Sequence, residues 1–364
     1  MNIIFHHPLP LDLNAKSASG IRPLRMLEAF QRLGYEVDIV AGYSKERKKA
    51  IKEVKKKIKL GAEYDFVYSE SSTMPTILTD KHHLPLNPLL DFSFFRFCKN
   101  NNIKVGLFYR DIYWLFESYD NSVSFLKGRA AKLSYIYELH FYKRYLSHLY
   151  LPSIEMGRYV PIVPSTIFSA LPPGHDIESQ VSENEYQNDS IHKLKVFYVG
   201  GMSDHYQMHI LFSVINQRDD IEFVLCTREN EWNALKSEYP ELSKNIKIVH
   251  KSGREMQALM ADSDIVSIFV KPQEYREFAA PVKLYEYLGH HKPIIASQGT
   301  LAGKFVAENK IGWSLPYDEK ALNSLFDELI CKPELIVEIK QQMNVVAESH
   351  TWQARAKQVI KDLV

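Results

Sequence analysis

The feature that most limits the possible folds is a regular alternation of short apolar runs with segments of helical periodicity. In the first half, apolar runs at 2–6 and 35–40 flank a helical pattern over 21–33. A strand, a helix and a second strand in this order form a βαβ unit of a parallel sheet. The alternation resumes with the run at 194–199. The sequence therefore predicts an α/β protein with two parallel-sheet domains.

The boundary between the two halves lies after Pro173, where a polar, acidic segment without apolar periodicity begins. With 364 residues, each half has enough chain to bury its own core. We expect a first domain over 1–173, a linker over 174–192, a second domain over 193–348 and a final amphipathic helix over 349–364.

The segment 271–297 has the composition of a loop, a short helix and a buried strand. Pro281 is at a position where a first-turn proline is tolerated, because its missing N–H would be unpaired there anyway. The residues 282–288 suit a helix, and Gly289 fits the left-handed position that ends one. Residues 293–296 then form a short apolar run typical of a strand.

Three side chains of this expected helix share one face. Lys283, Glu286 and Tyr287 are three and four residues apart. A helix N-terminus offers unpaired N–H groups and positive partial charge, which suit a diphosphate. Lys283 would add a full charge, and Glu286 could accept hydrogen bonds from ribose hydroxyls. The alternative is a surface helix with an ordinary Lys–Glu pair.

The run from Pro281 through Lys283, Glu286 and Tyr287 to Ile295 resembles the donor-site segment of GT-B glycosyltransferases. It is most similar to bacterial polysaccharide enzymes of the xanthan-type glucuronosyltransferase branch, and more distantly to the retaining family 4. The resemblance implies two Rossmann-like domains that face each other across a cleft, with the final helix returning to the first domain. It also implies that Lys283 binds the donor diphosphate and Glu286 the ribose.

Family 4 carries a second glutamate eight positions before the first, where this chain has Phe278 and, one step earlier, Glu277. The choice between a retaining and an inverting reaction therefore stays open. The glycines after the run 194–199 let a ligand approach the backbone. Relatives commonly place cations after this glycine, whereas this chain has Met202 there. The expected donor-binding set is Gly200, Gly201, Met202, Arg228, Lys271, Pro281, Val282, Lys283, Glu286 and Tyr287.

The acceptor side is expected in the first half, outside the carboxyl ends of its strands. Asp111 follows the predicted strand 104–109, and its surroundings, YRDIYW, resemble the segment in which an aspartate of these polysaccharide enzymes faces the acceptor. An acceptor hydroxyl must lose its proton in an inverting transfer, so Asp111 is the expected catalytic base. Three further residues are expected on the acceptor side: Gly20, Glu70 (expected in a loop with Ser71 and Ser72) and Arg110. Capping of a helix that starts at Ile112 is the alternative role of Asp111.

The net charge of +1 hides an asymmetry between the two halves. Residues 1–160 hold 24 Lys and Arg against 16 Asp and Glu, which gives +8, and the remainder gives −7. Most of the positive excess lies in Lys45–Lys59, with nine basic and two acidic residues. Ile51, Val54 and Ile58 give this helix a narrow apolar stripe. It is either a solvated face or a contact with anionic lipid. A nucleic-acid partner is not expected, because interleaved aromatic residues and recognition motifs are missing.

Cys98, Cys226 and Cys331 are odd in number and far apart, which fits neither a disulfide framework nor a zinc pattern. We expect all three to be core thiols. The start of the sequence lacks a secretory signal pattern, and no apolar run has the length of about 20 residues that a spanning helix needs. A cytoplasmic location is expected, peripheral to the inner face of the cell membrane where Lys45–Lys59 contacts lipid.

The expected function is transfer of a sugar from a nucleoside-diphosphate donor to an acceptor hydroxyl. The resemblance implies a UDP-sugar, with UDP-glucuronate as one candidate, and a product in bacterial surface polysaccharide or lipid-linked oligosaccharide synthesis. An Asp-x-Asp metal motif beside a strand is missing, so we expect a metal-independent enzyme without a cofactor. Two alternatives stay open: a sugar-nucleotide 2-epimerase of the same fold, and a non-catalytic nucleotide-sugar-binding protein.

Overall fold

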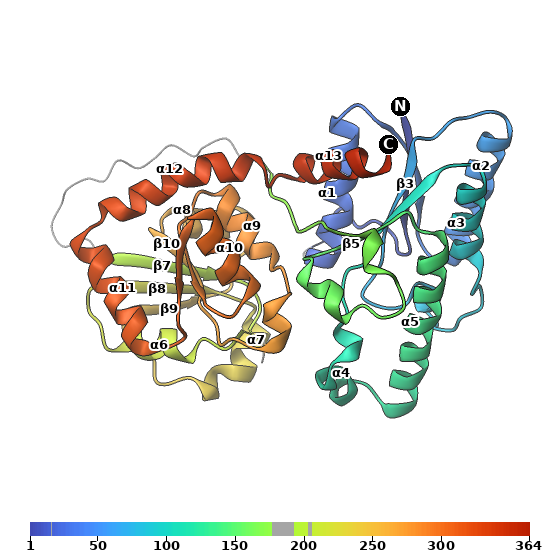
Figure 1. The fold of residues 1–364 in the computed structure, drawn as a ribbon. Helices are drawn as coiled ribbons and strands as arrows, with labels where there is room; N and C mark the ends of the chain where they lie inside the picture. The colour runs from blue at the N-terminus through green and yellow to red at the C-terminus, as the bar shows by residue number, and fades with distance from the viewer. Residues whose placement is uncertain (16, 177–192, 203–205) are drawn as a thin grey trace. The chain divides into compact units, whose positions relative to one another are not determined.

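The computed structural model describes residues 1–15, 17–176, 193–202 and 206–364. They form two units, one of Met1–Pro173 with Trp352–Val364 and one of Gly174–Thr351 (Figure 1). Most of the expected linker over 174–192 falls on residues 177–192, which lie outside the described residues.

The first unit is built on a parallel sheet of six strands in the order β2-β1-β3-β4-β5-β6. Phe5 of β1 pairs with Ile39 on one side and with Tyr68 on the other. The chain therefore switches direction across the sheet between β1 and β3. The strands are β1 (Asn2–His7), β2 (Glu36–Ala41), β3 (Phe66–Glu70), β4 (Lys104–Phe108), β5 (His148–Leu151) and β6 (Phe168–Ala170).

Helices cover both faces of this sheet. On one face α1 packs against α13, and their apolar side chains meet Phe5, Phe66 and Tyr68 in one core. On the other face α3 packs against α2 and α5 (Figure 1). The helices are α1 (Ala18–Arg32), α2 (Ser44–Lys59), α3 (Leu90–Asn100), α4 (Glu117–Ser122), α5 (Phe125–Tyr145) and α13 (Trp352–Leu363).

The second unit repeats this plan with a parallel sheet in the order β12-β11-β10-β7-β8-β9. Its first strand, β7, lies between β10 and β8, so the direction of the sheet switches between β7 and β10. Open α/β sheets bind ligands outside the carboxyl ends of the strands at such a point. The strands are β7 (Leu194–Val199), β8 (Ile221–Cys226), β9 (Ile246–Val249), β10 (Ile265–Ile268), β11 (Ile294–Ser297) and β12 (Gly312–Leu315).

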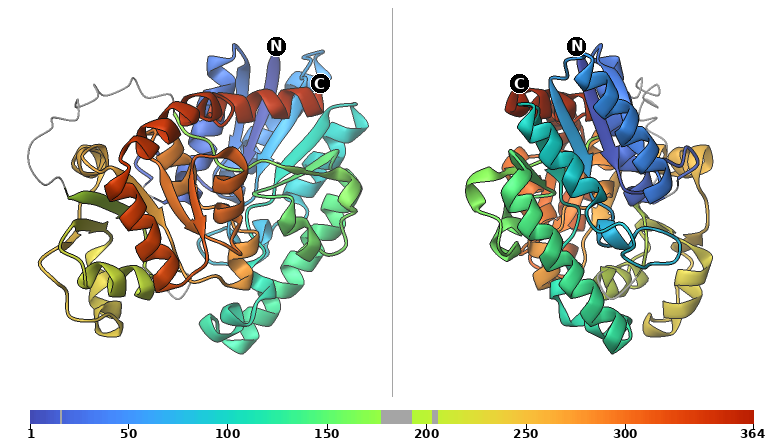
Figure 2. Two further views of the ribbon diagram at one scale, coloured as in Figure 1. Left: turned by 60° about the vertical axis from the view of Figure 1, so that its left-hand side comes forward. Right: turned by 90° about the vertical axis from the view of Figure 1, so that its right-hand side faces the viewer.

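Alternation along β7 divides the core of the second unit into two layers. Val196 and Tyr198 pack with α6 and α11, whereas Phe197 packs with α8, α9, α10 and α12 on the opposite face. Figure 2 shows these helices from two further sides. The helices are α6 (His209–Asn216), α7 (Glu229–Leu235), α8 (Gly253–Ala261), α9 (Val282–Gly289), α10 (Leu301–Asn309), α11 (Glu319–Cys331) and α12 (Glu334–Glu348).

Two local predictions were wrong. Gly289 does not end α9 in a left-handed conformation, because α9 includes it and His291 has the positive φ, 50°. A Cβ at position 289 would lie 2.6 Å from Nδ1 of His175, so this glycine makes room for a side chain. Cys98 and Cys226 are buried, but Cys331 in the last turn of α11 is exposed and is not a core thiol.

Among the residues that the structure describes, no helix is both long and apolar enough to cross a membrane.

Candidate donor and acceptor sites

Several of the expected donor-binding residues meet at the switch point between β7 and β10 of the second unit. The chain leaves β7 at Val199 and passes through Gly200, which has a φ of 142°. This positive φ favours glycine, and a Cβ on Gly200 would lie 2.6 Å from Nζ of Lys283, so the lysine side chain passes close to this backbone. Lys283 belongs to the first turn of α9, and Pro281 is the N-cap residue of that helix.

The Lys283 side chain is buried, with 7% of its surface exposed. Its Nζ donates a hydrogen bond of 2.5 Å to the Tyr198 hydroxyl and lies 3.9 Å from the ring centroids of Tyr198 and Tyr206. The Tyr198 hydroxyl in turn donates to the Gly201 carbonyl at 2.8 Å. No carboxylate in the described part of the chain forms an ion pair with this ammonium group.

Burial lowers the pKa of Lys283 well below its usual range, and the charge of Arg276 lowers it further, against the opposite effect of Glu286 and Glu231. Arg276 is 5% exposed and lies over the Tyr206 ring at 3.7 Å. Two cations therefore lie close together out of water, where repulsion is strong. An arriving anion would relieve this repulsion and favour the charged lysine.

Glu286 and Tyr287 have different environments although they are neighbours in α9. The partly buried Glu286 carboxylate accepts no hydrogen bond from any described residue, and burial raises its pKa. It can therefore accept hydrogen bonds from a ligand. The Tyr287 hydroxyl accepts a hydrogen bond from the Val199 backbone N–H at 2.9 Å. Tyr287 thus holds α9 to the end of β7, and its contact with the donor stays a prediction.

The two other expected donor-binding cations, Arg228 and Lys271, are exposed rather than buried. Arg228 is exposed and paired with Glu231 of α7, and Lys271 is exposed after β10. Glu231 also accepts a hydrogen bond of 2.9 Å from the Met202 backbone N–H, next to the Gly200–Gly201 turn. Neither Arg228 nor Lys271 is buried beside Lys283. The buried second cation is Arg276, from the short 3-10 helix η7 (Glu274–Glu277).

Sequence reasoning missed Arg276, Tyr198 and Tyr206. Tyr198 is the penultimate residue of β7, so the strand pattern placed it at the correct edge but gave it no role. Arg276 lies seven residues before Lys283 in a segment whose path no periodicity predicts. The only available indication was a cation within the loop that leads into the candidate helix.

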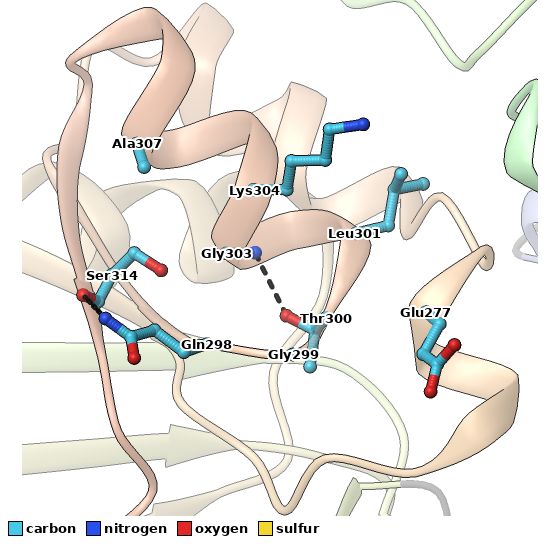
Figure 3. A pocket seen from close by; sticks show the side chains of 9 residues that line it. All are labelled: Glu277, Gln298, Gly299, Thr300, Leu301, Gly303, Lys304, Ala307 and Ser314. Carbon is cyan, nitrogen blue, oxygen red and sulfur yellow. Dashed lines mark hydrogen bonds between the residues drawn. The ribbon is translucent and has the colours of Figure 1, made fainter.

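A hollow of about 490 Å³ opens beside the start of α10 in the second unit (Figure 3). The Thr300 hydroxyl caps this helix, accepting from the Gly303 N–H at 3.0 Å and donating to the Ser297 carbonyl at 2.7 Å. Carboxylate, amide and hydroxyl groups of the lining are of the kind that bind sugar hydroxyls. The lining consists of Glu277, Gln298, Gly299, Thr300, Leu301, Gly303, Lys304, Ala307 and Ser314.

In the first unit, the expected acceptor residues gather around the carboxyl ends of β3 and β4. Glu70 is the last residue of β3 and fully buried, so its assignment to a loop was wrong. Arg110 donates to Glu70 Oε2 at 3.1 Å, Tyr68 donates to Oε1 at 2.8 Å, and Arg22 lies 3.2 Å from Oε1. Glu70 is saturated by these partners, which makes it a structural carboxylate that fixes Arg110.

Asp111 follows this cluster and is partly exposed. Its Oδ1 accepts a hydrogen bond from the Tyr113 N–H at 2.9 Å, at the start of the 3-10 helix η2 (Tyr113–Leu115). This bond forms a turn before η2, whose N-cap residue is Ile112 and has no side-chain cap bond, so Asp111 is not the N-cap of a helix that starts at Ile112. Gly20 lies in the first turn of α1, where a Cβ would meet the Ala15 side chain at 2.6 Å. The role of Asp111 as a base stays a prediction.

Comparison with known proteins finds similar structures but no similar sequence. No protein-family model matches the chain, and no curated protein matches its sequence. HepE of Anabaena in complex with UDP is similar over all of this chain and 99% of its own, with a TM-score of 0.64 at 15% identity.

Two further solved structures are similar over 99% of this chain. A sucrose-phosphate synthase from Thermosynechococcus elongatus has a TM-score of 0.65 at 14% identity over 98% of its length. A glycosyltransferase from Rickettsia africae has a TM-score of 0.65 at 13% identity over 97% of its length. With two six-stranded parallel sheets flanked by helices, the chain has the GT-B fold of two Rossmann-like domains.

Proposed function

We propose that this protein is a glycosyltransferase that moves a sugar from a nucleoside-diphosphate donor to an acceptor hydroxyl. The observation that carries the proposal is the pair of buried cations, Lys283 and Arg276, at the switch point of the second sheet. UDP is the first nucleotide to test, because structures of HepE contain UDP and UDP-glucose. The product proposed is a surface polysaccharide or its lipid-linked precursor.

In this proposal the donor diphosphate lies against Gly200 and Gly201 and between the two cations. Lys283 and the N-terminus of α9 stabilise the negative charge that develops on the leaving diphosphate, as a fixed electrostatic arrangement. Glu286 accepts hydrogen bonds from the ribose. Arg276 supplies the second charge at a place where Met202 supplies none. The reaction is proposed to need no metal ion.

The test is titration calorimetry of UDP with the parent and two matched variants. Lys283→Met should lose about 1.5–3 kcal/mol of UDP affinity, tenfold or more, because a charged hydrogen bond is removed. Lys292→Met is the control: Lys292 is also buried, but it donates to the Ala261 and Ser263 carbonyls. This control should lose stability and keep UDP affinity.

A second readout distinguishes a phosphate contact from a general loss of structure. Because burial lowers the pKa of Lys283, UDP binding to the parent should take up protons, and calorimetry in buffers of different ionisation enthalpy measures this. Lys283→Met should show less proton uptake. Equal affinity and equal proton uptake in parent and Lys283→Met would remove Lys283 from the donor site.

We also propose that α2 of the first unit, the unit expected to bind the acceptor, contacts anionic lipid. Arg47 does not contribute, because it is buried and donates two hydrogen bonds to Asp91, at 2.8 and 3.0 Å. Ile51 and Val54 are buried in the unit, so α2 presents lysines rather than an apolar stripe to solvent. The contact is therefore electrostatic only, worth about 1 kcal/mol per lysine near the surface.

Three exposed lysines, Lys48, Lys52 and Lys56, are four residues apart and form one row along α2. Their replacement by glutamate should abolish the part of vesicle binding that salt removes, without changing UDP affinity. Equal binding of the triple variant and the parent to vesicles with phosphatidylglycerol would show that α2 is only a solvated face.

A further inference from the structure

A second surface of the first unit exposes large apolar side chains on two neighbouring segments. Phe125, Leu126 and Leu133 of α5 are 72%, 79% and 71% exposed. Every residue from Lys81 to Leu89 is exposed. The large apolar side chains of this segment are Leu84, Leu86 and Leu89.

The two segments are joined. Leu126, Leu133 and Tyr137 are seven and four residues apart and therefore share one face of α5. The Tyr137 hydroxyl donates a hydrogen bond of 3.5 Å to the Pro88 carbonyl, and its ring packs edge-on against Phe92 at 5.9 Å. The apolar stripe of α5 thus continues into the loop 81–89.

This surface lies at the carboxyl end of the sheet. The segment that follows β3 is bound to the middle of α5, since Tyr135 donates to the Thr73 carbonyl at 2.6 Å and Ile77 donates to Glu138 at 3.1 Å. The earlier turns of α5 project beyond the strands at that end of the unit, next to α4 (Figures 1 and 2). This is also the end at which Asp111 follows β4.

The charge of this surface is positive. Residues 81–89 and 123–133 contain four Lys and Arg and no Asp or Glu. Arg129 lies over the Phe125 ring at 4.9 Å, so the apolar and cationic groups are interleaved. Nζ of Lys132 lies 2.7 Å from Oδ1 of Asp120, which partly neutralises its charge. The positive charge of the surface therefore comes mainly from Lys81, Lys127 and Arg129.

We infer that residues 81–89 and 125–133, which we name the α5 surface, insert into the interface of an anionic lipid bilayer. Exposed apolar side chains interleaved with cations match a lipid surface whose headgroups are negative and whose acyl boundary is apolar. The acceptor end of the first unit would then face the membrane, as a lipid-anchored acceptor requires. This goes beyond the α2 contact, which is electrostatic and contains no exposed apolar stripe.

The test uses sedimentation of the full chain with vesicles of phosphatidylcholine and phosphatidylglycerol. The apolar variant Phe125→Ser/Leu126→Ser/Leu133→Ser should lose partitioning by on the order of tenfold, because insertion of apolar area is removed. In the parent, part of the binding should persist in about 0.5 M salt, where the screening length is only a few ångströms. The apolar variant should lose that part.

A matched control removes exposed apolar side chains elsewhere: Val337→Ser/Val345→Ser on α12 should bind vesicles as the parent does. UDP affinity and thermal unfolding of each variant show that the fold is kept. As an independent readout, Phe125→Trp should add fluorescence that brominated lipids quench.

Three results would overturn the inference. The first is equal partitioning of the apolar variant and the parent. The second is a lack of quenching for Phe125→Trp in vesicles that bind the protein. The third is a concentration-dependent dimer of the parent that the apolar variant abolishes, since the α5 surface would then bind a second copy of the chain.

Discussion

Lys283 and Arg276 lie out of water, 3.9 and 3.7 Å from the centroid of the same Tyr206 ring. The negative face of a tyrosine ring offsets part of their repulsion, by about 0.5–2 kcal/mol for each cation. At the scale of residues, this pair of buried basic side chains is the reason for proposing a diphosphate as the ligand.

Asp111 is the residue for which two roles can be separated by one substitution. Asp111→Asn keeps an oxygen that can accept the Tyr113 N–H, which Oδ1 now does at 2.9 Å, so stability should change by less than about 1 kcal/mol. Asparagine cannot take a proton from the acceptor hydroxyl. Sugar transfer should therefore fall by about 10²–10⁴-fold, with UDP affinity unchanged. Transfer at the parental rate, or retention of anomeric configuration, would rule out Asp111 as the base.

Glu138 makes the stability of the first unit depend on pH. It is buried in α5, where it accepts hydrogen bonds from the Ile77 N–H and the Tyr142 hydroxyl, and burial raises its pKa to about 8 from 4.5. Between these values the folded state holds a proton that the unfolded state has lost. The contribution of Glu138 to stability therefore falls as pH rises from 4.5 to 8.

Glu138→Gln removes this dependence, because glutamine has the shape of the protonated acid. Urea unfolding should find the variant more stable than the parent at pH 8, by at least about 1 kcal/mol. The difference should shrink at pH 5. An equal difference in unfolding free energy between Glu138→Gln and the parent at both pH values would show that Glu138 does not bind the proton.

At the scale of elements, α9 is held in place by two contacts in its second half. Its Tyr287 hydroxyl receives the Val199 N–H, which fixes the helix to the end of β7. Its last residue, Gly289, lies against the ring of His175, whose Nε2 is 2.9 Å from the Ala347 carbonyl. The position of Lys283 next to Gly200 therefore depends on contacts at the far end of the helix as well as on its own.

Gly289→Ala tests this packing with a matched control. Alanine in a helix is ordinarily more stable than glycine by about 0.5–1 kcal/mol. At Gly128 of α5 an added Cβ meets nothing within 4 Å, so Gly128→Ala should stabilise the protein. At Gly289 the Cβ would lie 2.6 Å from the His175 ring, and destabilisation by about 1–3 kcal/mol is expected. Stabilisation by both substitutions in thermal unfolding would contradict the assigned packing.

The sequence predicted the strands well, because strands buried on both faces are short apolar runs with clear ends, as β7 and β11 are. Helical spacing placed Lys283 and Glu286 on one face of α9, and the resemblance to GT-B donor segments supplied their donor role, which stays a prediction. The sequence could not predict Arg276, because no periodicity indicates the path of η7. That path brings Arg276 to the same Tyr206 ring as Lys283. The first turns of α5 are likewise hard to predict, because Phe125, Leu126 and Leu133 are exposed and give no apolar stripe toward the core.

At the scale of the whole molecule, the two units repeat one sheet plan but differ in charge. The second unit gathers buried cations at its switch point, whereas the first unit saturates Glu70 with arginines and leaves Asp111 partly exposed. This division fits the proposal of a donor side that binds an anion and an acceptor side that removes a proton. In that proposal, each function can be lost separately by substitution.

The most direct test of the central claim is nuclear magnetic resonance of UDP-sugars incubated with the protein without acceptor. The donor that binds is found first by thermal stabilisation, since a ligand at about 100 times its dissociation constant adds about 2.7 kcal/mol. The parent and Lys292→Met should slowly release free sugar and UDP, and Lys283→Met should not. Binding of a UDP-sugar without any release by the parent, or conversion of the donor to an epimer, would contradict a glycosyltransferase.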